Sequence, residues 1–431
     1  MLLIYTHKIT PRFRYTMKQV FTRILGIDIT FSTKVEDFIK HTGPKITYTK
    51  QPLQNEFFVR CTNLLFEQGI QEIDITIGHW GDVPCFFKLA EDSAIPFDIF
   101  AASFWLLSRY EEYLPHVKDL HGRYPPRDSL AYQNNFLKMP VVDIWARKFL
   151  TLLQSRFPEI KFAKRTYEHT SIVDVTTSHA FAHRGFLRGV SGFLFDLLSF
   201  KFKRVAQRSK TWMNRKNDPY DNFSKLIALH KKFEVDSMFF FQFADYSTYD
   251  KNVSVNSNRF QFLIKSIGDY STIALSASYS SFNNVQLLRT EKKRLASVIN
   301  RPITSSRMRY NRVDVPDSYR HLVEAEFTDD YTMGYTHETG FRAGTCTPFH
   351  FYDINLEIRQ PVRVHPFAIH DYAFSNMRNR EEISDKIRSI YEEVKKVDGK
   401  FITIFSNELL GGSTKVNWQD LYADVLNEYH V

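Results

Sequence analysis

Residues 222–243 read NFSKLIALHKKFEVDSMFFFQF, a helix-forming segment followed directly by a strand-forming one. Leu226, Leu229 and Phe233 recur at three- and four-residue spacing, which is typical of a helix with one apolar face. The nearly continuous apolar run at 238–243 has the length of a buried strand. The segment therefore predicts one helix–strand unit of an α/β fold.

Similar units occupy the rest of the C-terminal part. The spacing of apolar residues predicts helices over 260–267, 285–299 and 383–397, and strands over 171–175, 272–276, 401–405 and near Ile303. Units of this length place helices outside a parallel sheet. Functional side chains are then expected after the carboxyl ends of the strands.

The first 165 residues have a different pattern. Residues 71–77 alternate with period two, as a half-buried strand does. Residues 97–114 and 142–153 have helical spacing, and the first of these helices is expected to stop at Pro115. A charged, aperiodic stretch follows at 155–170. We therefore expect a smaller α/β domain at 1–165 and a second domain at 166–431.

The composition is that of a globular protein. Of the 431 residues, 43% are hydrophobic and 24% are charged, so long disorder is not expected. The three cysteines are an odd number without paired spacing, which favours a reducing compartment. No run approaches the roughly 18 apolar residues of a membrane span, and the first apolar stretch is too short for a secretory signal. We expect a cytoplasmic protein.

The net charge of +9 is partly local. Seven basic residues and no acidic one lie between Asp196 and Asp218, directly after the mainly apolar segment 186–198. This order suits an anionic membrane surface or an acidic polymer, so residues 186–216 could attach the protein peripherally to the inner membrane. The alternative is a solvated helix that covers the second domain. Nucleic acid is not expected as a partner, because no recognised binding motif accompanies the charge.

Residues 340–349, GFRAGTCTPF, resemble the arginine motif of the polysaccharide deacetylases, the family-four carbohydrate esterases. Asp174 ends an apolar strand where that family places its catalytic Asp. The phrases at 4–10, 103–113 and 121–124 (IYTHKIT, SFWLLSRYEEY and HGRY) are similar to a two-domain branch found in Bacteroidota, with an N-terminal domain of unknown function. The resemblance implies a distorted (β/α) barrel of NodB type over residues 166–431.

The resemblance also implies roles for individual residues. In these enzymes a metal held by one Asp and two His activates a water, one Asp acts as base and a His protonates the leaving amine. Asp174 then matches the base, Arg342 its partner, Phe349 the backbone donor to the oxyanion, and Asp371 the acid that orients the base. Three further residues are candidates for contact with sugar: Asp330, Tyr331 and Pro348. For Asp330 the alternative is that it caps a turn.

Three family positions hold other residues. Thr176 stands where the metal-binding Asp is expected, Ser276 where a metal-binding His is expected, and Ser406 where the proton-donating His is expected. Neutral hydroxyls are poor Zn²⁺ ligands, and a serine does not protonate a leaving group near neutral pH as histidine does. The sequence therefore predicts degenerate metal ligands, no cofactor and no ordinary deacetylation.

Two other histidine pairs are candidate metal ligands, with ordinary surface histidines as the alternative for the first pair. His179 and His183 have helical i, i+4 spacing without a third ligand, while His365 and His370 with Asp371 could form a displaced Zn²⁺ site. Three functions stay open on this basis. The protein binds a glycan or a protein partner in envelope biology without catalysis, or it is an active deacetylase with a displaced metal, or it is purely structural.

Overall fold

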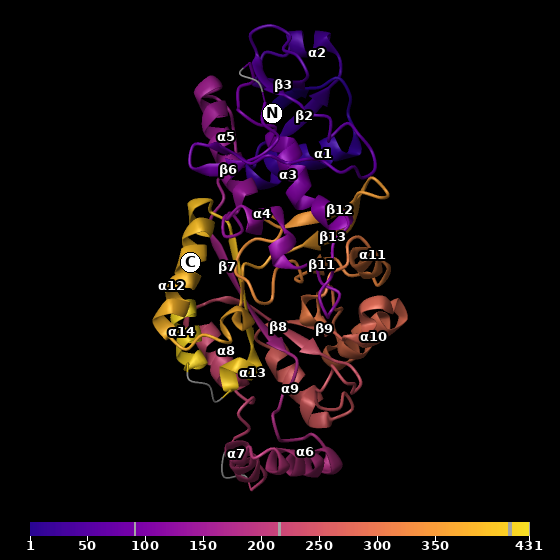
Figure 1. Cartoon of the computed structure of the whole chain (residues 1–431), viewed down its shortest axis with the longest axis vertical. Helices are drawn as coiled ribbons and strands as arrows, with labels where there is room; N and C mark the ends of the chain where they lie inside the picture. The colour runs from indigo at the N-terminus through magenta and orange to yellow at the C-terminus, as the bar shows by residue number, and fades with distance from the viewer. Residues whose placement is uncertain (90–91, 214–216, 413–415, 431) are drawn as a thin grey trace.

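The protein is a mixed α/β structure with two sheets of parallel strands joined end to end (Figure 1). The computed structural model describes residues 1–89, 92–213, 217–412 and 416–430. The N-terminal part contains a four-stranded parallel sheet in the order β2-β1-β3-β4. Its strands are β1 (Leu2–Tyr5), β2 (Ile29–Ser32), β3 (Lys45–Thr49) and β4 (Phe57–Arg60).

Among the described residues, this part also contains five α-helices, a π-helix at Lys18–Ile24, short 3₁₀ turns and a small hairpin. The helices are α1 (Pro11–Met17), α2 (Val35–Lys40), α3 (Ile99–Leu107), α4 (Leu130–Gln133) and α5 (Val141–Arg156), and the hairpin strands are β5 (Gly78–Trp80) and β6 (Val83–Cys85). The helix predicted at 142–153 is confirmed. The strand predicted at 71–77 is wrong, because these residues run without ladder partners up to β5.

The helix predicted at 97–114 is divided. It ends as α3 at Leu107, and Arg109 has a left-handed backbone with φ of 55° before a 3₁₀ turn begins at Tyr110. The turn brings the Arg109 side chain onto Glu111 and Glu112, with Nη2 to Oε1 and Nε to Oε1 distances of 2.5 and 2.7 Å. Apolar spacing continues across this break, so the pattern alone could not locate it.

The C-terminal part contains a nine-stranded sheet in the order β12-β13-β11-β10-β9-β8-β7-β15-β14. All neighbours are parallel except β12 and β13. The strands are β7 (Glu168–Val175), β8 (Asp236–Gln242), β9 (Thr272–Ala277), β10 (Ser305–Met308), β11 (Asp329–Asp330), β12 (Phe349–Asp353), β13 (Ile358–Val364), β14 (Ile369–His370) and β15 (Lys400–Ser406). The predicted strands at 171–175, 272–276 and 401–405 are confirmed.

The connection from β13 to β14 shows that this sheet is strongly curled. β13 pairs with β11 toward one edge, whereas β14 pairs with β15 at the other edge. Only residues 365–368 separate the two strands, and four residues span at most about 14 Å. The two sides of the sheet must therefore approach each other and enclose an interior.

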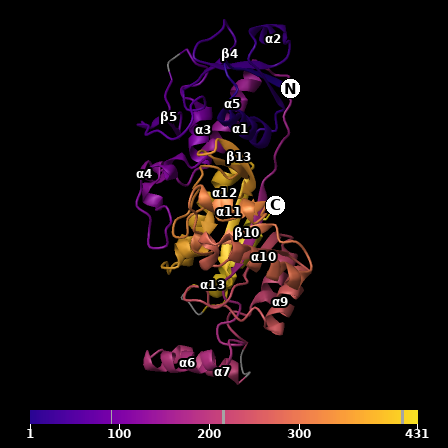
Figure 2. The same ribbon diagram turned by 90° about the vertical axis from the view of Figure 1, so that its right-hand side faces the viewer.

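Helices cover the outside of the curled sheet (Figures 1 and 2). They are α8 (Phe223–Lys232), α9 (Asn258–Gly268), α10 (Val285–Ile299), α11 (Asp317–Glu324), α12 (Arg380–Lys396), α13 (Asn407–Gly411) and α14 (Trp418–Tyr429). The helices predicted over 222–233, 260–267, 285–299 and 383–397 are thus confirmed within two or three residues.

Two helices stand apart from the rest. α6 (Phe186–Leu198) and α7 (Phe202–Trp212) leave the sheet after β7 and form a projection at the end opposite the N-terminal part (Figures 1 and 2). We call residues 186–213 the α6–α7 hairpin. The hairpin projects away from the sheet. The alternative interpretation of this segment, a solvated helix that covers the second domain, is therefore wrong. Among the described residues, no helix is both long and apolar enough to cross a bilayer.

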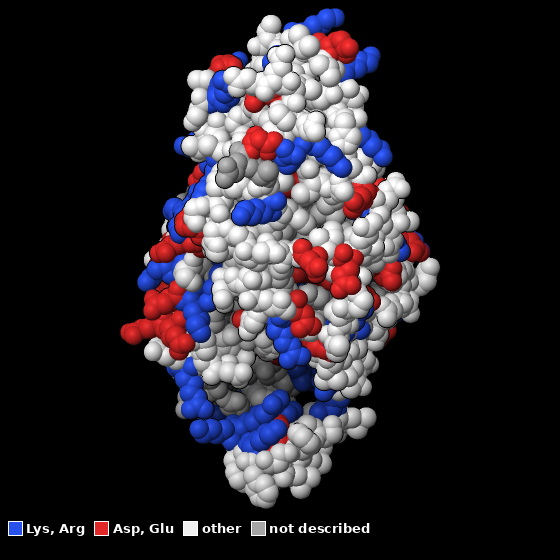
Figure 3. All heavy atoms as spheres, turned by 45° about the horizontal axis from the view of Figure 1, so that its top comes forward, with Lys and Arg blue, Asp and Glu red and all other residues white. Residues whose placement is uncertain are grey.

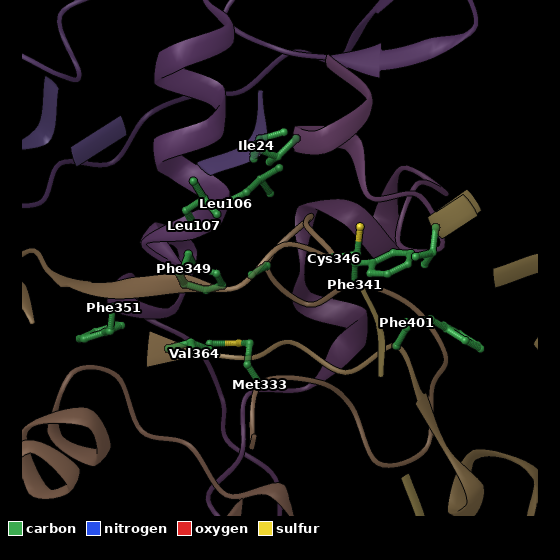
Figure 4. Packing of buried hydrophobic residues seen from close by; sticks show 14 of the residues in the cluster. Ile24, Leu106, Leu107, Met333, Phe341, Cys346, Phe349, Phe351, Val364 and Phe401 are labelled. Atoms are coloured by element: carbon green, nitrogen blue, oxygen red, sulfur yellow. The ribbon is translucent and has the colours of Figure 1, made fainter. Parts of the chain in front are cut away.

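The two parts share a continuous apolar core. Leu106 and Leu107 at the end of α3 lie beside Phe349 of β12, and Phe341 and Cys346 fill the space next to them (Figure 4). These side chains are each at most 1% exposed. Apolar burial therefore continues across the boundary expected near residue 165.

Candidate functional site

The interior of the curled sheet is apolar in its middle and polar nearer the carboxyl ends of the strands. Side chains on a strand alternate between faces, so Ile172 and Asp174 of β7 point the same way. Ile172 belongs to a buried cluster that we call the apolar plug. Its members are Ile172, Met238, Phe240, Ala274, Tyr331, Phe367, Ile402 and Ile404.

Continuing the alternation toward the carboxyl ends brings a set of polar side chains above the plug. Asp174 is in register with Ser406, and Ser276 is in register with both Gln242 and Arg307. These five residues form what we call the polar layer. Each is at most 8% exposed. The structure thus brings together Asp174, Ser276 and Ser406.

The cation of the polar layer is Arg307 and not Arg342. The Nε–H of Arg307 donates to Asp174 Oδ2 at 3.4 Å, and its Nη2 donates to Asn311 at 2.5 Å. The predicted pairing of Asp174 with Arg342 is wrong. Arg307 is the penultimate residue of β10, which pairs with β9, and no sequence signal distinguishes it from other arginines until that pairing is known.

The guanidinium of Arg307 lies among three carboxyl groups. Burial lowers the pKa of Arg307, and the charges of Asp174, Asp371 and Asp330 oppose that effect. Burial also raises the pKa of Asp330 to about 6, against hydrogen bonds from Thr332 and the charge of Arg307. A fixed protein cation therefore already balances the acidic groups of this interior.

The hydroxyls at the three substituted positions have different surroundings. Thr176 donates to Glu408 Oε1 at 2.6 Å, and Ser406 donates to Asp371 Oδ2 at 2.6 Å through its side chain. Ser276 Oγ is buried without a hydrogen-bond partner among the described residues. Ser406 also caps α13 by accepting from the backbone N–H of Leu409. Two of the three hydroxyls thus have structural partners of their own.

The residues present do not fit the metal that the resemblance implies. A Zn²⁺ site needs three protein ligands from His, Cys or carboxylates together with space for a water. In the part of the chain that the structure describes, no group of three such side chains is placed to hold an ion. The acids near Asp174 already face Arg307, and the hydroxyls that replace the ligands are neutral.

The Arg342 motif lies at the contact between the two parts of the chain. Arg342 donates to Glu112 from Nε and Nη2 at 2.9 and 2.7 Å, and Arg109 donates to the backbone oxygen of Arg342. Burial raises the pKa of Glu112, but Arg342 and Arg109 outweigh it and hold that pKa at about 2. We call this contact, formed by residues 340–349 with the N-terminal part, the junction.

Asp143, at the start of α5, makes a second set of junction contacts. It accepts hydrogen bonds from the Thr345 and Thr347 hydroxyls and from the backbone N–H of Cys346. Gly344 has φ of 63°, and a Cβ there would lie 2.7 Å from Leu106 Cδ1. The glycine and threonines of the motif are therefore explained by packing against the N-terminal part.

Four other predicted residues also lie away from the polar layer or have internal partners. Phe349 is fully buried in β12, where it pairs with Val364, and Asp330 binds Thr332. Tyr331 reaches into the apolar plug and stacks on His365 with ring centroids 4.3 Å apart. Tyr331 and Pro348 line a cavity that includes the first residues of β7 and β15, so they lie toward the amino ends of those strands. The structure does not bring these two beside Asp174.

The histidine pairs do not form metal sites. His179 and His183 lie in a non-helical segment with ring centroids 5.0 Å apart, so their i, i+4 spacing does not place them on one face of a helix. His365 Nε2 binds Asp329 at 2.7 Å, and Arg363 binds the same carboxylate. His370 Nδ1 is 2.9 Å from Asp371 Oδ1.

A hydrogen-bonded chain connects the polar layer to a surface cavity of about 390 Å³. From Arg307 it passes through Asn311 to the Thr336 hydroxyl, which also accepts from Arg123 of the N-terminal part at 3.1 Å. The cavity is lined by both parts of the chain, including Tyr124, Tyr132, Tyr335, Asn311 and Arg342. Its volume falls in the range of small-ligand sites.

An aromatic cluster lies next to this cavity. Tyr249 stacks on Tyr279 with ring centroids 4.0 Å apart, and His121 stacks on Tyr310 at 4.6 Å. Tyr310 also accepts a hydrogen bond at its backbone oxygen from the cavity residue Arg123. The tyrosines follow β8, β9 and β10, so their rings surround the carboxyl ends of these strands. These residues are far apart in the chain, so no sequence motif marks them as one cluster.

Comparison with known proteins gives a partial result. Residues 2–158 match the family model described as "Family of unknown function (DUF7033)". No curated protein matches the chain.

Three solved structures are similar to this chain at low identity. A protein from Mycobacterium smegmatis that is assigned as a polysaccharide deacetylase is 11% identical, with a TM-score of 0.41 over 62% of this chain and 86% of that chain. Puue allantoinase is 11% identical, with a TM-score of 0.39 over 73% and 91% of the two chains. The polysaccharide deacetylase Bc1974 from Bacillus cereus is 9% identical, with a TM-score of 0.31 over 62% and 92%.

Proposed function

We propose that this chain is a divergent polysaccharide deacetylase homologue that binds a glycan and does not hydrolyse it. In this proposal the curled sheet of residues 166–431 is a distorted barrel of NodB type, and the cytoplasmic protein acts in cell-surface polysaccharide or envelope biology. The motif-level resemblance and the position of Asp174 at the carboxyl end of β7 support the relationship.

The observation that carries the loss of catalysis is the position of Arg307. The ordinary mechanism needs a metal ion to lower the pKa of water from about 16 to about 7. Here a guanidinium faces Asp174, and threonine and serine stand at the ligand positions. An arginine supplies positive charge but has no vacant coordination site for water. Asp174 is therefore left as a carboxylate without a metal-bound water to activate.

Glycan binding is supported by the cavity and the aromatic cluster. Sugars are bound by aromatic rings that stack on their C–H faces and by polar groups that meet their hydroxyls. The cavity supplies Tyr124, Tyr132 and Tyr335 together with charged groups such as Arg123 and Asp119. A purely structural protein needs no such concave polar and aromatic surface, so we favour a bound glycan over a structural role.

Metal content tests the loss of catalysis. Elemental analysis of the purified protein after incubation with Zn²⁺, Ni²⁺ or Co²⁺ is expected to find well below one ion per chain, and acetylated sugars are expected to stay acetylated. The triple variant Thr176→Asp, Ser276→His and Ser406→His should gain metal, since it restores one carboxylate and two imidazoles. One ion per chain in the unaltered protein, with hydrolysis abolished by Asp174→Asn, would contradict the proposal and favour the displaced site.

Glycan binding is tested at the cavity. On an array of acetylated and unmodified oligosaccharides the protein is expected to bind a subset of the sugars. The double variant Tyr132→Ala with His337→Ala should lower the affinity for these sugars at least about tenfold, because it removes stacking and hydrogen-bonding groups. Tyr132 is 41% exposed, so its removal leaves the core intact. Tyr270→Ala, which removes an exposed tyrosine elsewhere, is the matched control. Equal retention by both variants would place the glycan outside this cavity.

A further inference from the structure

The α6–α7 hairpin exposes an unusual number of large apolar side chains. Phe186, Leu187 and Leu198 are 84%, 82% and 77% exposed. Seven further large apolar residues of the hairpin are also exposed: Leu194, Phe195, Leu197, Phe200, Phe202, Trp212 and Met213. A contiguous apolar surface of this kind marks an interaction site rather than ordinary solvent-exposed surface.

The apolar residues of α6 share one helical face. Phe186, Val190, Leu194 and Leu197 follow one another at three- and four-residue spacing, and Leu187 and Leu198 flank the same stripe. The stripe does not lie against the curled sheet, because six of the hairpin's exposed apolar residues belong to α6 itself. The face is therefore presented outward.

Contacts between α6 and α7 keep this apolar face exposed. Asp196 of α6 accepts from Arg208 of α7 at 2.6 Å, and both side chains are at most 6% exposed. A Cβ at Gly189 would lie 3.0 Å from the Trp212 ring, so the glycine allows α6 and α7 to approach closely. These contacts fix the two helices against each other and leave the apolar stripe without an internal partner.

Basic side chains lie beside the apolar surface. Lys201, Lys203, Arg204 and Lys210 are exposed, whereas the acidic Asp196 is buried. Lys203, Arg204 and Lys210 line a cavity of about 640 Å³ between α7 and the segments at 180–181 and 217–220. Figure 3 shows Lys and Arg gathered just above an uncharged tip at the lower end of the molecule.

We propose that the α6–α7 hairpin docks on the surface of a membrane containing anionic phospholipids. The apolar stripe enters the boundary between headgroups and acyl chains, and the basic side chains contact the phosphate groups. Residues 214–216 carry further basic side chains but lie outside the described residues. The proposal does not depend on glycan binding or on the loss of the metal.

The position of the hairpin adds an orientation. It follows the carboxyl end of β7, the same end at which the polar layer lies, and the four-stranded N-terminal sheet is at the far end of the molecule (Figure 1). A docked protein therefore presents the carboxyl ends of the strands toward the bilayer. Its N-terminal sheet points away from the membrane.

The test is co-sedimentation of the full chain with vesicles of phosphatidylglycerol and phosphatidylethanolamine, compared with phosphatidylcholine alone. The unaltered protein should pellet with the anionic vesicles at low salt. Leu187→Glu with Leu198→Glu should lower the partition coefficient at least about 100-fold, because two large apolar groups no longer leave water. Lys203→Glu with Lys210→Glu should lower it about 25-fold or more, and high salt should have a similar effect.

The matched control is Ile39→Glu with Lys40→Glu on α2, at the far end of the molecule, which should bind as the unaltered protein does. A second readout is a blue shift of tryptophan fluorescence on vesicle addition that is lost in Trp212→Phe, since Trp212 is 42% exposed. Absence of pelleting with anionic vesicles overturns the proposal. Dimerisation that Leu187→Glu with Leu198→Glu abolishes, without vesicle binding, assigns the face to a second copy of the chain instead.

Discussion

Arg342→Met is expected to lower the free energy of unfolding by about 3–5 kcal/mol at pH 7. Among the described residues, the substitution leaves buried Glu112 with Arg109 as its remaining ion-pair partner, while Arg109 must also balance Glu111. Arg342 and Glu112 are 1% and 2% exposed at their side chains, so water cannot replace the lost hydrogen bonds. Chemical denaturation followed by tryptophan fluorescence measures the change.

The double variant Arg342→Met with Glu112→Gln should recover a large part of this loss. It removes one charge of each sign and leaves Arg109 paired with Glu111. Arg380→Met is the matched control, because its partner Asp424 and Arg380 itself are 49% and 42% exposed and such pairs contribute about 1 kcal/mol or less. A loss for Arg342→Met no greater than for Arg380→Met would show that the junction pair is not a stabilising contact.

Arg307→Met is expected to destabilise the protein by a similar amount, about 3–5 kcal/mol at pH 8. The variant leaves Asp174, Asp371 and Asp330 in a buried interior without their cation. Asp330 already has a pKa of about 6, above the unfolded value, so the folded state binds more protons than the unfolded state between about pH 4 and 6. Wild-type stability from this group therefore falls as pH rises through that window.

Removing Arg307 should raise the pKa of Asp330 further and so extend this pH window upward, because Asp330 loses the nearby charge that favours its ionised form. The destabilisation should thus be smaller at pH 5.5 than at pH 8. Arg307→Lys keeps the charge and should lose less than Arg307→Met at both pH values. An equal loss at the two pH values would show that packing of Arg307, and not its charge, stabilises the interior.

Much of the C-terminal sheet could be predicted from the sequence. The strands at 171–175, 272–276 and 401–405 and the four long helices have strong apolar periodicity, and each is within a few residues of its predicted place. The strand predicted at 71–77 failed, because alternation alone does not supply a neighbouring strand for its hydrogen bonds. The prediction of one continuous helix over 97–114 also failed. Apolar spacing continues past Leu107, but the chain turns at Arg109 and places its side chain in a buried ion pair with Glu112.

Only those residues of the candidate site that lie at or near the ends of strands could be predicted from the sequence. Asp174, Ser276 and Ser406 end or nearly end parallel strands, so their convergence follows from the sheet. The role expected for Arg342 rested on a motif, and the motif's polar groups bind Glu112 and Asp143 of the N-terminal part instead. Arg307 could not be chosen over other arginines without knowing which strand lies next to β9.

The junction also has a consequence for the inheritance of this protein. Glu112 and Asp143 come from one part of the chain, while Arg342, Thr345 and Thr347 come from the other. A recombination event that joined this N-terminal part to a different sheet would remove the donors that Arg342, Thr345 and Thr347 supply to these two acids. The two parts should therefore be transmitted together, and substitutions at position 143 should be accompanied by changes at 345 and 347 in descendants of this sequence.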